Sequence, residues 1–202
     1  MRPLTVDDLI PLTEYVPERA EHAAAAARYL DRYRRVRVGP KLTFLFENRQ
    51  TLWFRLQELL RAARLTDPAL VQQELDWYNR LLPARGRLQA ALHIEIREGS
   101  EWAQEMALWR GLSESAVTLR IGSSAIAAQF ITCRPEDRAI GAEHWAEFTM
   151  DEAARAALAD RRATAHIAVE HGGYSHQSGS LSDMVRQSLL DDLTLSDRDQ
   201  AA

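Results

Sequence analysis

The second half of the chain alternates apolar and polar residues with the period of two that is typical of strands with one buried face. From Arg87 to Arg97, the even-numbered positions are apolar. From Val117 to Phe130, the alternation continues on both sides of Gly122-Ser123-Ser124, which predicts a hairpin. We predict further strands over residues 139–148 and 165–170.

The first half of the chain has the wider apolar spacing of amphipathic helices, after a short capped turn within residues 1–16. Pro17 suits a first helical turn, and Asn48 and Asp67 are N-cap residues. Leu42–Phe46 is apolar on both faces, so we predict a strand that is covered on both sides. The predicted helices cover residues 17–35, 48–63, 67–82, 102–109, 151–160 and 181–193.

This order of helices, one strand, two helices and then mostly sequential strands favours the α+β class. We expect one mostly antiparallel, mixed sheet of about five or six strands with flanking helices. With 202 residues and 46% apolar content, the chain can bury one substantial core. We therefore predict a single domain over residues 1–195 and a frayed tail over residues 196–202.

Charge and composition exclude several classes of function. The net charge of −4 gives no basic field for nucleic acid. Cys133 is the only cysteine, so the chain holds no disulfide, no Cys-x-x-Cys pair and no iron–sulfur cluster of its own. No basic leader and no long apolar run occur, so we expect a soluble, cytoplasmic protein without membrane contact. No recognisable motif encodes a cofactor.

The residues Glu47, Asn48 and Arg49 stand where the predicted strand gives way to a helix. A helix N-terminus beside an acid and a base can hold an anionic substrate or move protons, so Glu47 and Arg49 are candidate catalytic residues. Alternatively, Asn48 caps the helix while its neighbours form ion pairs that lock the fold.

The two helices that follow carry more polar groups, which can converge with Glu47 if both helices flank the strand. Glu58 is a further catalytic candidate, and the candidate binding residues are Asn48, Gln57, Glu74, Tyr78 and Asn79. The Glu-x-x-His pairs of di-iron helix bundles are absent from the sequence, which argues against such a centre.

Histidine and carboxylate residues in the second half suggest a single divalent metal as a further alternative. His93, Glu95 and Arg97 share one face of a predicted strand, which lines either a polar pocket or solvent. Glu95, His144 and His171 are candidate ligands, and Glu95 and His144 are also catalytic candidates. Histidines exposed on loops are the alternative interpretation.

Several blocks of the sequence together resemble DUF3501, a family of uncharacterised bacterial proteins. They are Met1-Arg-Pro-Leu-Thr-Val-Asp-Asp-Leu, Leu42-Thr-Phe-Leu-Phe-Glu-Asn-Arg, Trp53-Phe-Arg-Leu-Gln-Glu-Leu-Leu-Arg, Glu74-Leu-Asp-Trp-Tyr-Asn-Arg-Leu-Leu-Pro, Ala90-Ala-Leu-His-Ile-Glu-Ile and, more weakly, His144-Trp-Ala-Glu-Phe and His171-Gly-Gly-Tyr. The last block makes Tyr174 a candidate binding residue. His93 departs from the pattern, which has an apolar residue there.

The resemblance implies gene neighbours that encode a rubrerythrin-like protein and a cysteine-rich iron–sulfur oxidoreductase. Three hypotheses for function follow. The chain is an accessory or binding component of a redox or oxidative-stress system with one of those partners, or a small-molecule, metal-assisted enzyme whose pocket holds Glu47, Arg49, Glu95 and His144. The third hypothesis is a homodimeric structural protein.

Overall fold

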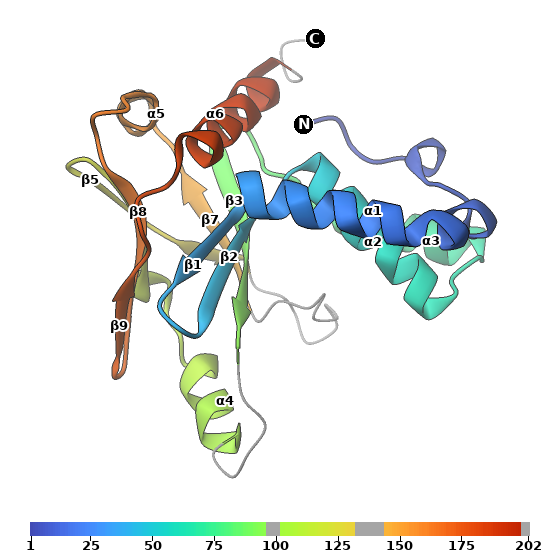
Figure 1. The fold of residues 1–202 in the computed structure, drawn as a ribbon, viewed down its shortest axis with the longest axis horizontal. Helices are drawn as coiled ribbons and strands as arrows, with labels where there is room; N and C mark the ends of the chain where they lie inside the picture. Colours follow the sequence, from blue (N-terminus) through green and yellow to red (C-terminus); the bar gives the residue numbers. More distant parts are fainter. Residues whose placement is uncertain (96–101, 132–143, 199–202) are drawn as a thin grey trace.

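The computed structural model describes residues 1–95, 102–131 and 144–198. Their strands form two antiparallel sheets (Figure 1). The five-stranded sheet has the order β1-β2-β3-β7-β6 and the four-stranded sheet the order β5-β4-β8-β9. The strand bounds are β1 Arg35–Val38, β2 Leu42–Phe46, β3 Arg87–Ile94, β4 Val117–Ile121, β5 Ser124–Ala127, β6 Gln129–Ile131, β7 His144–Thr149, β8 Ala165–His171 and β9 Tyr174–Gln177.

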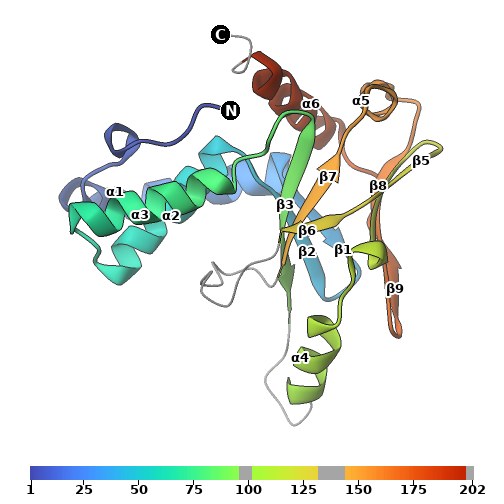
Figure 2. The ribbon, with the colours of Figure 1, turned by 180° about the vertical axis from the view of Figure 1, so that it is seen from behind.

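The helices other than α4 cover one face of the five-stranded sheet and one end of the space between the sheets, and α4 lies at the opposite end of the molecule (Figures 1 and 2). α1, α2 and α3 lie on the face that points away from the second sheet, while α5 and α6 close the end. The helix bounds are α1 Leu12–Tyr33, α2 Arg49–Ala63, α3 Pro68–Arg80, α4 Trp102–Arg110, α5 Glu152–Ala159 and α6 Asp183–Arg198, with 3-10 turns at Val6–Asp8 and Glu114–Ala116.

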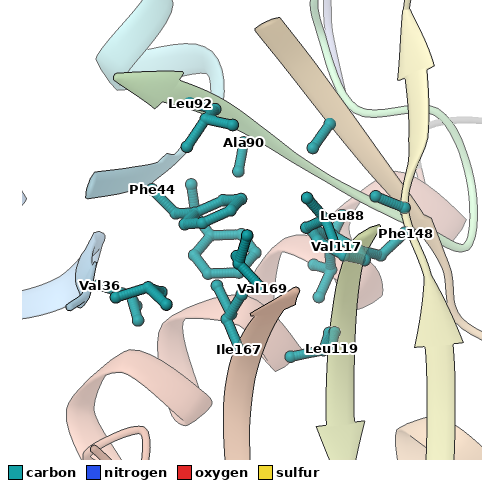
Figure 3. Packing of buried hydrophobic residues seen from close by; sticks show 14 of the residues in the cluster. Val36, Phe44, Leu88, Ala90, Leu92, Val117, Leu119, Phe148, Ile167 and Val169 are labelled. Carbon is teal, nitrogen blue, oxygen red and sulfur yellow. The ribbon is translucent and has the colours of Figure 1, made fainter. Parts of the chain in front are cut away.

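The main core lies between the two sheets (Figure 3). Phe44 of β2 and Phe148 of β7 face Ile167 and Val169 of β8, and all four side chains are fully buried. Burying a side chain of this size contributes about 1.5–3 kcal/mol, so this interface is the main source of stability. A second core lies under α2 and α3, around Leu52, Leu56, Leu75, Tyr78 and Trp145.

The predicted α+β class is confirmed, with the strands divided between two sheets instead of one. The hairpin around Gly122 is also present, but its second arm is split at the buried residue Ala128. β5 pairs with β4, whereas β6 crosses to the other sheet and pairs with β7. The alternation of apolar and polar residues through Phe130 therefore spans two strands, β5 and β6. Their apolar side chains pack against the same core.

The sequence analysis did not predict two short strands, β1 and β9. β1 directly follows the first helix and overlaps its predicted range only at Arg35. Val36 and Val38 are buried on one face of this strand, between Arg35 and Arg37. β9 lies in a stretch rich in Gly, Ser and His, whose composition hides its pairing with β8. Each is only four residues long, which is too short for periodicity to be read.

The first helix starts at Leu12, so Pro17 lies in its second turn instead of its first. The proline ring removes one helical hydrogen bond, which the packing of the fully buried Tyr15 offsets. The closing helix runs to Arg198, three residues into the segment we expected to be frayed. Within the described residues, none of the helices has the length and apolarity needed to cross a membrane.

Candidate functional site

The cap of α2 occupies the first backbone donors of that helix. The Asn48 side-chain oxygen accepts hydrogen bonds from the N–H groups of Gln50 and Thr51, at 3.0 and 3.1 Å. In return, the Asn48 N–H donates to the Thr51 hydroxyl at 2.9 Å. This capping box satisfies the donors that we expected at the junction, so they are not offered to an anionic ligand.

The Asn48 amide group joins three helices. It donates to the Tyr29 hydroxyl at 2.9 Å and to Asp192 at 3.3 Å. Asp192 of α6 also forms a buried ion pair with Arg34, whose guanidinium donates to Tyr29 at 2.8 Å. Burial raises the pKa of Asp192, and the hydrogen bonds from Arg34 and Asn48 act against that rise. Asn48 therefore serves the packing of α1, α2 and α6.

Gln57 and Asn79, both candidate binding residues, bind the chain's own N-terminal segment. The Gln57 amide donates to the Ile10 carbonyl at 2.7 Å and accepts from the Ile10 N–H at 3.2 Å. Asn79 does the same with Leu4, at 2.9 and 2.7 Å. Trp53 is a third side chain that binds the segment, because its indole N–H donates to the Asp8 carbonyl at 2.8 Å. These side chains act as clamps on the segment.

Arg49 and Glu58, two catalytic candidates, are engaged in ion pairs. Arg49 contacts Asp8 at 2.6 Å, and its hydrogen bond holds the pKa of Asp8 well below the usual range. Glu58 accepts from Arg19 at 2.8 Å and from Arg61 at 3.0 Å. Burial raises the pKa of Glu58, but these hydrogen bonds prevail and lower it to about 2. Both residues fasten α2 to the segments around it.

Glu74, Tyr78 and Tyr174 are buried to different degrees. Glu74 is half-buried on α3, and Tyr78 is fully buried beneath α2. Burial raises the pKa of Tyr78, whose hydroxyl lacks a hydrogen-bond partner among the described residues.

Tyr174 donates to the Val38 carbonyl under the β1–β2 turn. A Cβ atom at Gly39 would lie 2.5 Å from the Tyr174 hydroxyl, so this contact requires glycine.

The structure does not bring the three candidate metal ligands together. His144 is in register with Leu92, so it lies on the inter-sheet face, where its ring stacks on Phe130 at 5.0 Å. Glu95 is exposed just beyond β3, and His171 lies in the β8–β9 hairpin. Within residues 1–95, 102–131 and 144–198, no group of three His, Cys, Asp or Glu side chains is placed to hold a metal ion.

The four residues of the expected enzyme pocket are likewise separated. Glu47 is buried under α2, Arg49 is paired with Asp8, Glu95 is exposed, and His144 faces the opposite side of the sheet from α2. Because neighbouring residues of a strand point to opposite faces, His144 points away from the helices while the next residue, Trp145, points toward them. Arg97 and Cys133 lie outside the described residues.

A cavity of about 370 Å³ lies between α1, α2 and the strands β2 and β3. This volume falls at the lower end of the range of small-molecule sites. Its lining combines apolar side chains with a few polar ones. The lining residues are His22, Ala25, Ala26, Tyr29, Leu30, Leu45, Gln50, Thr51, Trp53, Phe54, Arg55 and His93. We call this cavity the α1–α2 pocket.

Glu47, Arg55 and His93 form an array of polar side chains, of which Arg55 and His93 line the pocket and Glu47 is buried beside Arg55. The Glu47 carboxylate, whose side chain is 0% exposed, pairs with the Arg55 Nε atom at 2.8 Å. Arg55 Nη2 lies 3.0 Å from His93 Nε2. Because a guanidinium has no acceptor, His93 Nε2 accepts this hydrogen bond, and the proton of the neutral imidazole lies on Nδ1. The guanidinium also lies 5.5 Å from the ring centre of Trp145.

Thr51 completes the support of this array, because its hydroxyl donates to the second oxygen of Glu47. The hydroxyl therefore accepts from the Asn48 N–H and donates to the carboxylate. The same short sequence that caps α2 thus fixes the acid that holds Arg55. A guanidinium held at its Nε atom and flanked by an aromatic ring has little freedom to reorient.

Two neighbouring hollows, of about 430 and 410 Å³, meet the α1–α2 pocket at Gln50. Their polar walls consist of groups already bonded to one another, such as Arg49 with Asp8 and Arg34 with Asp192. The α1–α2 pocket differs because more of its lining is apolar, including Ala26, Leu30 and Phe54. Of these three cavities of the described residues, it is the one better suited to an organic ligand.

Sequence reasoning identified Glu47 but missed Arg55, Thr51 and Tyr29 as residues of the site. Arg55 lies off the apolar stripe of its helix in the sequence, yet its side chain is only 16% exposed in the structure. The available signal was the spacing of Thr51 and Arg55, one helical turn apart, after an acid at the strand end. His93 was noticed as a departure from the family pattern, and its strand position places it on the helical face.

Comparisons with known proteins bear on the family and not on an activity. The chain is similar to a novel protein of unknown function from Burkholderia pseudomallei K96243, whose crystal structure has 29% sequence identity and a TM-score of 0.81. That match covers 95% of this chain and 100% of the other. A search of curated proteins gave no match. The family model for DUF3501, described as a protein of unknown function, matches residues 3–193 of the chain. The chain therefore belongs to the DUF3501 family.

Proposed function

We propose that this protein binds a small organic molecule in the α1–α2 pocket. The observation that carries the proposal is the Glu47–Arg55–His93 array beside a cavity whose lining is partly apolar. Buried ion pairs are costly to desolvate and are often no better for stability than apolar packing. A charged array beside a cavity is therefore better explained by recognition of a ligand than by stability alone.

The shape and lining of the pocket support a ligand with one polar end and one apolar end. Arg55 and His93 belong to the polar part of the lining, and Ala26, Leu30 and Phe54 belong to the apolar part. A few fixed polar groups in a mainly apolar cavity are the usual design of small-molecule sites. The proposal is for binding, because the other catalytic candidates lie elsewhere in the fold.

Filling the pocket tests the proposal. Ala26→Phe places a ring in the cavity, whereas Ala24→Phe places the same ring on the exposed side of the same helix. Fragments from a mixture of small aromatic and aliphatic compounds should shift the NMR signals of His93 and Phe54 in the wild type and in Ala24→Phe. Ala26→Phe should abolish these shifts. Fragment shifts that persist in Ala26→Phe, or that never occur, would contradict the proposal.

The redox setting stays a prediction of the family resemblance. With Cys133 as the only cysteine of the chain, an iron–sulfur cluster held by several cysteines would have to belong to a partner. We propose an iron–sulfur oxidoreductase or a rubrerythrin-like protein as that partner. Affinity purification from the native host after crosslinking should recover one of them. Recovery of the chain without either would count against the partnership.

A further inference from the structure

We infer that the ligand of the α1–α2 pocket is an organic acid, bound with its carboxylate at Arg55 and His93 and with its apolar body against α1. The inference rests on the proposed function and names its ligand class. It follows from the signs of the charges around the cavity, from the way in which Arg55 is held, and from the apolar part of the lining.

The pocket lining is rich in hydrogen-bond donors and in groups that carry positive charge. Arg55 contributes a permanent cation, and His22 and His93 contribute two imidazoles. None of the described residues that line the cavity is Asp or Glu. Such a lining disfavours an amine, which would meet a cation without a counter-charge, and favours a negatively charged or strongly accepting group.

Arg55 is fixed in a geometry that suits a carboxylate. Glu47 holds the Nε atom of the guanidinium, and the Nη2 atom contacts His93, which lines the cavity together with Arg55. A carboxylate at the terminal edge would lie nearer to the cation than to the Glu47 carboxylate, which is fully buried. Since Coulomb energy falls with distance, attraction to Arg55 exceeds repulsion from Glu47. A rigid fork of donors is also the preferred partner of planar carboxylates.

The rest of the pocket fits an apolar body. Ala25, Ala26 and Leu30 of α1 line the cavity together with Phe54 of α2, and Leu45 of β2 adds a branched side chain. The volume of about 370 Å³ suits a compact molecule. An acid with one ring or a short branched chain would place its charge at Arg55 and leave its body on these side chains.

Three matched probes test the inference on the wild-type protein: phenylacetate, phenylacetamide and 2-phenylethylamine. They share one apolar body and differ in charge. Isothermal titration should show that phenylacetate binds about ten-fold or more tightly than phenylacetamide, because a charge-assisted hydrogen bond is the stronger one. 2-Phenylethylamine should bind most weakly. Equal binding of the acid and the amide would overturn the inference while leaving the proposed function intact.

Two variants locate the source of the preference. Glu47→Gln keeps the shape of the acid but removes the repelling charge, so the affinity for phenylacetate should rise. Glu47→Gln combined with Arg55→Met removes both charges together, which avoids an unpaired buried carboxylate. In that double variant the acid and the amide should bind equally. A preference for the acid that survives in a folded double variant would place the anion site elsewhere and overturn the inference.

Failure of the proposed function and failure of the ligand class give different experimental results. If no probe binds the wild type and the fragment mixture gives no shifts that Ala26→Phe removes, the proposed function fails together with the inference. If fragments bind in the pocket without preference for acids, only the ligand class is wrong.

Discussion

The two faces of the five-stranded sheet bury side chains of different kinds. The face toward the second sheet is apolar, with Phe44, Leu92 and Phe148 in a continuous core. The face toward α2 and α3 mixes apolar side chains with polar ones, among them Gln89 and Glu147. Alternate residues of the same strands therefore serve two environments: one is suited to stability, and the other can hold charge beside a cavity.

The polar content of the two faces indicates where a functional site lies in a protein whose sequence shows no motif. Buried polar side chains cost free energy unless they are paired, and proteins keep few of them without a role. On the helical face, the Tyr78 hydroxyl and the Gln89 side-chain nitrogen lack partners among the described residues. The polar face therefore contributes less to the stability of the fold than the apolar face does. It borders the α1–α2 pocket.

The largest effect is expected from breaking the apolar face. Phe44→Ala removes a fully buried ring between the sheets and should lower the free energy of unfolding by about 4 kcal/mol, through lost burial and the cavity that remains. Urea denaturation followed by circular dichroism measures this loss. A loss below about 1 kcal/mol would show that the inter-sheet core is not the main source of stability.

On the polar face, the pairing of charges should matter more than their presence. Arg55→Met leaves the Glu47 carboxylate buried without its ion pair and should cost about 3 kcal/mol. The double variant with Glu47→Gln should recover most of that loss. The coupling between the two substitutions is measured in a double-mutant cycle. Additive losses would contradict the arrangement described for the array.

A smaller effect is expected where α2 meets α1, at Glu58. The pKa of Glu58 is lowered from 4.5 to about 2 in the folded protein. Its ionised form therefore stabilises the fold above pH 4.5, and this stabilisation is lost as the pH falls from about 4.5 to about 2. We expect a contribution of about 1–2 kcal/mol, because the side chain is partly exposed.

Glu58→Gln should remove this part of the acid sensitivity in urea titrations between pH 6 and pH 2. Glu74→Gln, on the next helix, is the matched control and should keep the wild-type slope. An unchanged slope in Glu58→Gln would show that its ion pairs with Arg19 and Arg61 contribute nothing in solution.

The smallest global effect is expected from the clamps on the N-terminal segment. Asn79→Ala removes the two hydrogen bonds to Leu4 and should cost about 1 kcal/mol. Hydrogen exchange at the Leu4 amide should become faster, while exchange at Phe44 and Val169 should not change. Faster exchange throughout the inter-sheet core would mean that the segment is part of the global folding unit.

Much of the fold could be predicted from the sequence because its signals are local. The period of two located β3, and the caps at Asn48 and Asp67 located α2 and α3. The candidate site could be predicted only in part. Glu47 was found because it follows an apolar strand, but its partner Arg55 lies on a helix whose orientation depends on packing against the sheet.

Local sequence patterns were enough to predict the α+β class, most helices and strands, and the family. Which polar residues meet depends on how these elements pack against one another. Asn48, Gln57 and Asn79 turned out to bind the protein's own chain, and Glu47 was brought to Arg55 and His93. The physical reason is that periodicity and capping act within one element, whereas a pocket forms between elements that are distant in the sequence and are positioned by burial of their apolar faces.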